Sequence, residues 1–404
     1  MTETVGLVLS GGGARGAYEA GILSGIAEAL ALKPGEPAPF HVVAGTSVGA
    51  INGAWVAANA HRGDLGVDQL LHLWRALRLE HHLRIDVMGL LGWLSPFTSL
   101  RKADDGDTHL GRSLLDPRAL EGIVQTSIDW RQLHANVASG TMKAFVVAAL
   151  HIGTGVTAMF AELAPGAEFR PMRHPRRVAK IGPITADHVL ASAAIPALFP
   201  ARRVGSSYFV DGGLRFNTPM APAIRVGAEK LVVVTLRHDP PVAPSIDTPG
   251  DSTDAYPNPL FLAGKVLNAL LLDAVSYDLQ ILERFNRMMD VLSVTLAPDE
   301  RARVDAVLVE SRGMAYRKIE TLAFEPSVDI GLLAGTHLRH HLGRWDVGSV
   351  SEWLLARAAS SDATWESDLA AYLLFDGTWA EALIDIGRAD ALAKRDEIRH
   401  FFRR

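Results

Sequence analysis

The sequence predicts an α/β fold with a mainly parallel central sheet, followed by a mainly helical C-terminal extension. Residues 5–9 and 41–44 are short apolar runs, which are typical of buried strands. Between them, apolar side chains recur at helical spacing over residues 18–30. A strand, a helix and a second strand in this order predict a βαβ unit, in which the two strands are parallel and the crossover is right-handed.

A glycine-rich loop follows the first predicted strand and has the sequence Ser10-Gly11-Gly12-Gly13-Ala14-Arg15-Gly16. Glycines in such a loop expose backbone N–H groups, which can bind an oxyanion or a phosphate. We expect the loop at the carboxyl edge of the sheet, where open α/β sheets place their sites. Arg15 could steady the loop around an oxyanion, contact a phosphate, or hold the loop through a salt bridge.

A G-x-S-x-G motif follows the second predicted strand, in the order Gly45-Thr46-Ser47-Val48-Gly49. Residues 50–58 after it are predicted to be helical, so Ser47 would stand at a sharp strand-to-helix turn with its hydroxyl projecting. The flanking glycines tolerate a tight backbone, and the helix N-terminus favours negative charge near the hydroxyl. The motif predicts a nucleophilic serine. The alternative is a tight turn in which Ser47 caps the helix.

An aspartate with two glycines behind it, Asp211-Gly212-Gly213, ends a further apolar run at residues 209–210. The glycines would let this carboxylate approach another loop closely. The alternative is an Asx turn, in which the Asp211 side chain bonds the backbone two residues further on.

Together these segments resemble the patatin-like phospholipase family in their order and spacing. The family's glycine-rich loop matches residues 11–16, its serine motif matches 45–49, and its aspartate motif matches 211–213. The block at 191–200 also resembles a family segment before the aspartate. The resemblance extends over roughly residues 5–236, and four ordered blocks are far more specific than any one of them.

The resemblance implies a three-layer α/β/α core and a hydrolase that cleaves carboxylic esters of lipids or phospholipids. It implies that Ser47 is the nucleophile and Asp211 the general base, without a histidine. We expect no metal, because no ligand set with suitable spacing occurs in the sequence and two side chains suffice for the chemistry, and we expect no other cofactor. The oxyanion hole would comprise Gly11, Gly12, Gly13, Arg15 and Gly16, and the motifs would be supported by Gly45, Gly49, Gly212 and Gly213. An aspartate has an ordinary pKa of roughly 3.9, so Asp211 must be buried to become a useful base, because desolvation raises the pKa.

Three other interpretations account for fewer of these motifs. The glycine loop also fits the G-x-G-x-x-G dinucleotide fingerprint, but the second predicted strand does not end in the acidic residue that this fingerprint requires. An α/β-hydrolase would use a Ser-Asp-His triad, but such a fold places several strands before its nucleophile, and only one fits before the strand that leads into Ser47. A non-catalytic regulatory protein could retain the fold, but all three motifs are intact.

The composition narrows the class of protein further. The 404 residues are 48% hydrophobic and 21% charged, which is typical of a globular protein. A formal net charge of −5 argues against a nucleic-acid partner. The lack of cysteine excludes disulfides and a thiol nucleophile and is consistent with a cytoplasmic protein. No apolar stretch fits a signal peptide or a membrane span, so we expect any membrane contact to be peripheral.

A proline-rich segment predicts a division of the chain, because six prolines lie between residues 240 and 259. We expect a catalytic core at 1–237, a connecting loop at 238–259, and a mainly helical extension packed on the core at 260–404. The apolar stretch at 87–97 could form a lid over a lipid site. The alternative is an ordinary buried loop or helix.

Overall fold

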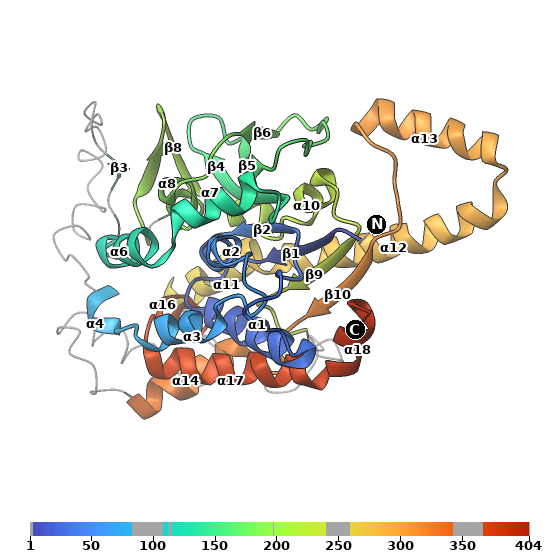
Figure 1. The fold of residues 1–404 in the computed structure, drawn as a ribbon. Coiled ribbons are helices and arrows are strands. Elements are labelled where there is room, and N and C mark those ends of the chain that lie inside the picture. Colours follow the sequence, from blue (N-terminus) through green and yellow to red (C-terminus); the bar gives the residue numbers. More distant parts are fainter. Residues whose placement is uncertain are drawn as a thin grey trace, which may run out of the picture.

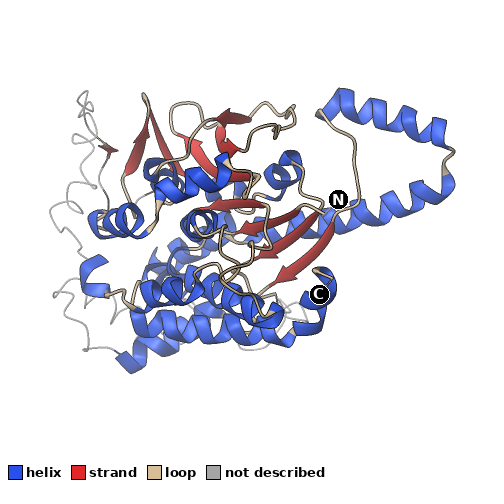
Figure 2. Ribbon diagram, viewed as in Figure 1, coloured by secondary structure: helices blue, strands red, loops and turns tan. Residues whose placement is uncertain are grey.

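The computed structural model describes residues 3–82, 108–111, 113, 115–196, 198–239, 259–341 and 367–403. These residues form one mixed sheet with helices on both faces (Figure 1). The predicted three-layer α/β/α arrangement is confirmed, and the strands lie between helical layers in Figure 2. The stretch at 87–97, the candidate lid, lies outside the described residues, as does most of the predicted connecting loop.

The described strands form a ten-stranded sheet. They are β1 (Val5–Leu9), β2 (Val42–Thr46), β3 (His109–Leu110), β4 (Ala144–His151), β5 (Thr157–Leu163), β6 (Arg177–Ile181), β7 (Ala201–Val204), β8 (Ser207–Asp211), β9 (Lys230–Val234) and β10 (Glu320–Phe324). The main order is β10-β9-β1-β2-β4-β8-β7-β3, and β5 pairs with β4 and β6. The five strands from β10 to β4 are parallel, as predicted for the core. The strands β8, β7, β3 and β5 add antiparallel pairs.

The central strands are apolar throughout because both of their faces are covered. In β1, Leu7 and Leu9 pack with the helices of one layer, whereas Val8 packs with the other layer. The first layer includes α1 (Gly16–Leu30), α2 (Val48–Ala58), α3 (Val67–Arg75) and α17 (Gly377–Ala393). The second includes α9 (Gly213–Phe216), α10 (Met220–Val226) and α12 (Asp273–Thr295).

The other described helices surround these layers. They are η1 (Gly13–Arg15), α4 (Leu79–His82), α6 (Arg118–Ser127), α7 (Trp130–Ala138), α8 (Ala186–Ser192), α11 (Pro259–Leu271), α13 (Pro298–Arg312), α14 (Ile330–His341), α16 (Ser367–Leu373) and α18 (Arg395–Phe401). The helices α12 and α13 form a hairpin that projects beyond the sheet in Figure 1. No helix in the described part of the chain combines the length and the apolar composition needed to cross a bilayer.

The C-terminal part of the chain packs directly on the βαβ unit. The helix α17 lies along α1 (Figure 1), and glycines allow their backbones to come close. A Cβ atom at Gly21 would collide with the Ile384 carbonyl oxygen, and one at Gly387 would collide with the Tyr18 carbonyl oxygen. The strand β10 also extends the sheet beside β9. The helical extension therefore contributes one strand to the sheet and a long helix to the core.

Candidate active site

Ser47 occupies the turn between β2 and α2. Its backbone has φ 55° and ψ −128°, and a positive φ is uncommon for a residue with a side chain. The turn is tight enough to require glycine on both sides. A Cβ atom at Gly45 would collide with the Gly49 carbonyl oxygen, and one at Gly49 would collide with the carbonyl oxygen of Leu9. The Ser47 side chain makes no capping hydrogen bond to α2, so the capping role weighed as an alternative is not observed.

The register of β4 brings Ser47 and Asp211 together. The strand β2 runs parallel to β4 and ends with Thr46 opposite Ala148. The strand β8 runs antiparallel to β4 and ends with Asp211 opposite Ala149. Because Ala148 and Ala149 are consecutive, β2 and β8 meet end to end at β4. The turn after β2 therefore lies against the end of β8.

Asp211 is fully buried, and one of its carboxylate oxygens is already engaged. Its Oδ1 atom accepts a hydrogen bond from the Gly213 N–H at 2.7 Å. This is the Asx turn weighed as an alternative for the motif. The Oδ2 atom makes no hydrogen bond of full geometry with the described protein atoms. The Asx turn therefore fixes the carboxylate and leaves the second oxygen available.

Burial raises the pKa of Asp211 to about 7, although hydrogen bonding from Ser47 and from the Gly213 N–H lowers it. The Ser47 hydroxyl is therefore close enough to lower the pKa of Asp211, although it does not form a well-aligned hydrogen bond with Oδ2. Such contacts are commonly long in unliganded enzymes and tighten with substrate. A carboxylate with a pKa near neutrality can both take and return a proton at physiological pH.

The block at 191–200 forms hydrogen bonds with the backbone of both Ser47 and Asp211. The Ser47 N–H donates to Ser192 Oγ at 2.8 Å, and Ser192 Oγ donates to the Ala148 carbonyl at 2.6 Å. The Asp211 N–H donates to the Ala194 carbonyl at 2.9 Å. The resemblance singled out this block, but nothing in its sequence indicated that Ser192 would bond the Ser47 backbone.

The glycine loop lies against Ser47. A Cβ atom at Gly11 would come within 2.8 Å of the Ser47 Cβ atom. The Gly11 N–H donates to Asn217 Oδ1 at 2.8 Å, and Asn217 Nδ2 donates back to the Gly11 carbonyl at 3.2 Å. Among the described residues, the N–H groups of Gly12 and Gly13 make no hydrogen bond to protein. Two N–H groups of the loop are therefore available for an oxyanion, whereas that of Gly11 is engaged with Asn217.

Arg15 turns away from the loop toward the C-terminal part of the chain. Its side chain is 3% exposed, and its Nη2 atom lies 3.5 Å from Asp368 Oδ1 in α16. The guanidinium also lies over the Tyr372 ring, 4.5 Å from the ring centroid. Of the roles weighed for Arg15, the salt bridge that holds the loop is the one observed.

The other glycines of the loop and of the aspartate motif are required for close packing. Gly13 has a φ of 60°, and a Cβ atom there would come within 2.5 Å of the Tyr372 carbonyl oxygen. A Cβ atom at Gly16 would collide with the Val48 side chain beside Ser47. A Cβ atom at Gly212 would collide with the Ala148 carbonyl oxygen, and one at Gly213 would come within 2.9 Å of Asp211 Oδ1.

A second buried carboxyl group lies beneath the glycine loop and was missed by the sequence analysis. Burial raises the pKa of Glu19 to about 8, although hydrogen bonds from Asn52 and from the Ser10 backbone lower it. Asn52 Nδ2 donates to Glu19 Oε2 at 2.8 Å, and Trp74 Nε1 donates to Asn52 Oδ1 at 3.1 Å. This network joins α1, α2 and α3 below the loop. A lone glutamate inside an amphipathic helix gives no signal of such a partner.

Histidines and metal ligands do not contribute to the site within the described residues. No histidine side chain there hydrogen-bonds to Ser47 or Asp211, and no group of three potential metal ligands occurs there. The described geometry therefore contains a Ser-Asp pair without the third member of a triad.

Comparison with known proteins identifies the family of the chain. The family model for patatin-like phospholipases matches residues 7–224. Because this match covers more than half of the chain, the chain belongs to the patatin-like phospholipase family, and the resemblance found in the sequence is confirmed. The family places the chain among the lipid acyl hydrolases.

The chain was also compared with solved structures and with curated proteins. The crystal structure of VipD from Legionella pneumophila is similar to the chain at 13% identity and a TM-score of 0.36, and the alignment covers 98% of this chain and 67% of that chain. No curated protein gives a significant match to the chain.

Proposed function

We propose that the chain hydrolyses carboxylic esters of lipids through an acyl-enzyme on Ser47, with Asp211 as the general base. The observation that carries this proposal is the end-to-end meeting of β2 and β8 on β4, which puts a serine in a strained turn against a buried carboxylate of near-neutral pKa. The substrate class follows from the family, and phospholipids and lysophospholipids are the first esters to test.

In the first half-reaction, the Ser47 oxygen attacks the ester carbonyl while its proton passes to Asp211 Oδ2. The N–H groups of Gly12 and Gly13 bind the resulting oxyanion, in a role where one donor is typically worth roughly 3 kcal/mol. Collapse of the tetrahedral intermediate breaks the bond to the alcohol, which leaves with the proton from Asp211. The products of this half-reaction are the free alcohol and an ester on Ser47.

Water completes the cycle by the same route. Asp211 takes a proton from the attacking water, and the same N–H groups bind the second oxyanion. Collapse releases the carboxylic acid and returns the proton to Ser47. The atoms balance with one water consumed for each ester, and the two side chains suffice without a metal or another cofactor.

The test is covalent labelling with a fluorophosphonate probe, followed by peptide mapping. We expect one label per chain, on Ser47, and no label on the Ser47→Ala variant. Ser311→Ala is the control, because Ser311 is exposed in α13, where its hydroxyl donates to the Val307 carbonyl, and its loss should leave the label on Ser47. Hydrolysis of a phospholipid and neutral-ester panel should disappear with the label. Labelling or hydrolysis that persists in Ser47→Ala would reject the assignment.

A further inference from the structure

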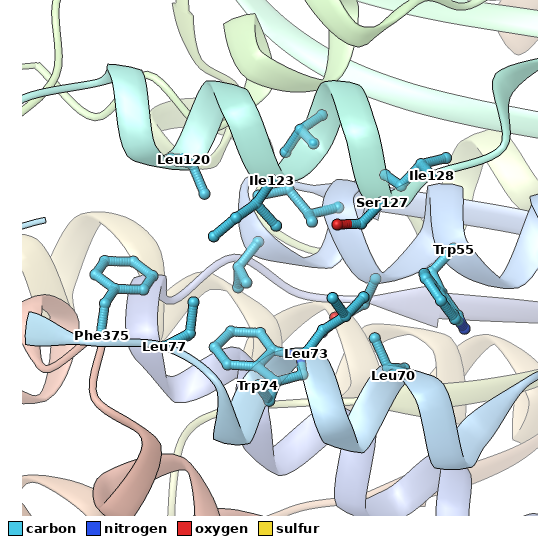
Figure 3. Close-up of a pocket in the computed structure, with 14 residues that line it drawn as sticks. Trp55, Leu70, Leu73, Trp74, Leu77, Leu120, Ile123, Ser127, Ile128 and Phe375 are labelled. Atoms are coloured by element: carbon cyan, nitrogen blue, oxygen red, sulfur yellow. The ribbon is translucent and has the colours of Figure 1, made fainter. Parts of the chain in front are cut away.

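A cavity of about 340 Å³ lies in the second helical layer, between α10, α12 and residues 312–319, which lead into β10. The mostly apolar cavity between α3 and α6, shown in Figure 3, has only about 60 Å³. Ligand sites in proteins commonly have volumes of roughly 300–1,000 Å³. The cavity beside α12 is therefore large enough for a small ligand, whereas the cavity in Figure 3 is not.

Positive charge predominates in the wall of the cavity beside α12. Arg177 of β6, Arg312 and Arg317 line it, whereas Asp278 of α12 is the one acidic residue among the described lining residues. Even when ionised, Asp278 offsets only one of the three positive charges. Arg225 lies outside the wall and donates through Nη2 to the Arg312 carbonyl at 3.0 Å. Burial lowers the pKa of Arg225, and repulsion from Arg312 and Arg177 lowers it further, as expected for cations that lie close together.

The arginines of the wall have donors that the protein does not use. Within the described part of the chain, none of their guanidinium groups forms a salt bridge with a carboxylate. Arg312 Nη1 and Arg317 Nη2 donate to backbone carbonyls at 2.9 Å and 2.6 Å, and Arg317 Nε is buried without a described partner. The Arg177 guanidinium lies over the Phe216 ring, 4.3 Å from the centroid, and makes no hydrogen bond with a described residue. Unused guanidinium donors in a half-buried site favour a carboxylate or a phosphate.

The other side of the cavity is apolar. Ile281, Leu282 and Phe285 recur at helical spacing on one face of α12. Met220 and Ile224 of α10 also line the cavity. A small polar anion would leave these side chains in contact with water, whereas a hydrocarbon chain would cover them. The wall therefore fits a ligand that has an anionic end and an apolar end.

We propose that this cavity binds a single-chain amphiphile whose anionic head group contacts Arg177 and Arg312 and whose chain packs along α12. This inference goes beyond the proposed function and does not depend on the reaction at Ser47. Carboxylate and phosphate head groups both accept paired hydrogen bonds from a guanidinium. A fatty acid and a single-chain lipid phosphate are therefore two sources of the same chemistry.

The first test measures binding to the head-group end. Sodium decanoate, decyl phosphate and decyltrimethylammonium are titrated into the full chain by calorimetry at neutral pH, below their micelle-forming concentrations. We expect the two anionic probes to bind and the cationic probe not to bind. Arg177→Gln should weaken the anionic probes at least about tenfold, and Arg177→Lys should weaken them less, because lysine keeps the charge without the planar fork. Arg176→Gln removes the same charge at the neighbouring exposed position outside the wall, so it should have less than a threefold effect.

The second test fills the apolar end. Ile281→Trp introduces bulk into the cavity, whereas Gln280→Trp adds the same bulk at the next position of α12, which is exposed and outside the wall. We expect Ile281→Trp to weaken both anionic probes at least about tenfold and Gln280→Trp to leave them unchanged, with circular dichroism to verify the fold. The anionic probe that binds more tightly identifies the head group.

Two results would overturn the inference. One is binding of the cationic probe as tight as that of the anionic probes, because the arginines would then contribute nothing. The other is anionic binding that Arg177→Gln or Ile281→Trp leaves unchanged in a folded protein, because the probe would then lie elsewhere. Ester hydrolysis is not a readout in either test, so a failure of the proposed function would leave both results interpretable.

Discussion

Arg15, in the candidate oxyanion loop, pairs with Asp368, which lies far along the sequence in α16. The Nη2 atom lies 3.5 Å from Asp368 Oδ1 and 3.4 Å from the Asp368 carbonyl oxygen, and both residues are buried. Asn268 of α11 is 3.4 Å from the same nitrogen and accepts a hydrogen bond from the Tyr372 hydroxyl at 3.0 Å. Residues outside the segment matched by the family model therefore hold the glycine loop in place.

Replacement of Asp368 by asparagine should weaken both stability and turnover. The change removes the carboxylate that pairs with Arg15 and also with Lys265, whose Nζ atom lies 3.0 Å from Asp368 Oδ2. The Lys265 side chain is half exposed whereas the Arg15 guanidinium is buried, so we expect the loss at Arg15 to dominate a cost of about 3 kcal/mol in the free energy of unfolding. A loosened loop should lower kcat about tenfold and change KM less than twofold, because the loop acts on the oxyanion rather than on substrate binding. Urea unfolding and steady-state kinetics measure the two effects.

Asp290→Asn is the matched control for this charge change. Asp290 pairs with Lys318 at 2.8 Å, but both side chains are more than half exposed, so its loss should cost less than about 1 kcal/mol and leave kcat unchanged. Asp368→Glu keeps the charge and should recover part of the lost turnover. If Asp368→Asn lowers stability and leaves kcat intact, the pair has a structural role only.

Asp211→Asn should remove turnover almost as completely as Ser47→Ala. Asparagine keeps the shape of the side chain and can still accept the Gly213 N–H, but it lacks the basic oxygen. Because the two residues act as one unit, the double variant should be no slower than either single variant. Kinetic measurements on the three variants test this, with circular dichroism to verify the fold. A histidine whose replacement gave the same loss in a folded protein would instead indicate a Ser-Asp-His triad.

The pH dependence of kcat/KM should follow the ionisation of Asp211. The base must be deprotonated to accept the Ser47 proton, and its pKa is about 7. We therefore expect kcat/KM to rise with pH, to reach half of its plateau near pH 7, and to fall about tenfold per pH unit well below that value. A plateau that already extends down to pH 5 would contradict the role of a buried base.

The burial of Asp211 should make folding stability fall as the pH rises, whereas kcat/KM should increase. The pKa of Asp211 is about 7 in the folded chain and 3.8 without its surroundings, so the folded state holds more protons between these values. Folding stability is therefore lost as the pH rises from about 4 to about 7. Asp211→Asn removes this loss. The free energy of unfolding of the variant minus that of wild type should therefore be larger at pH 8 than at pH 5. Glu19 titrates in both proteins and cancels in the difference. A difference between the proteins that does not change with pH would contradict the raised pKa.

The sequence was sufficient for those parts of the site that depend on local geometry. Ser47 could be placed in a strand-to-helix turn because the glycines, the apolar run before it and the helix after it are all neighbours in the chain. Ser192, Asn217 and Asp368 could not be assigned, because their partners lie between 145 and 353 residues away. Ordinary polar residues gain such roles only from the register of the sheet and the docking of the C-terminal helices, for which a single sequence carries no local pattern.

Gly13→Ala should lower kcat at least a hundredfold, which is on the order of the effect of losing an oxyanion donor. Alanine at this position must adopt a φ of 60° and place its Cβ atom within 2.5 Å of the Tyr372 carbonyl oxygen. The backbone then has to shift, and the Gly13 N–H moves away from the place where the oxyanion forms. Steady-state kinetics measure the loss, and the rate of fluorophosphonate labelling should fall with it, because the probe needs the same donor.

Two further glycine variants make this prediction specific to the loop. Gly122→Ala in α6 introduces a Cβ atom with no heavy atom within 4 Å, so it should leave kcat unchanged and stabilise the helix by up to about 1 kcal/mol. Gly12→Ala places its Cβ atom 2.6 Å from Leu236 Cδ1 and 3.4 Å from Leu236 Cβ. Because side-chain atoms and not the backbone have to shift, the variant should fold and show an intermediate loss. If both loop variants fold and retain wild-type kcat, the N–H groups of Gly12 and Gly13 do not bind the oxyanion. The donors would then have to come from another part of the site.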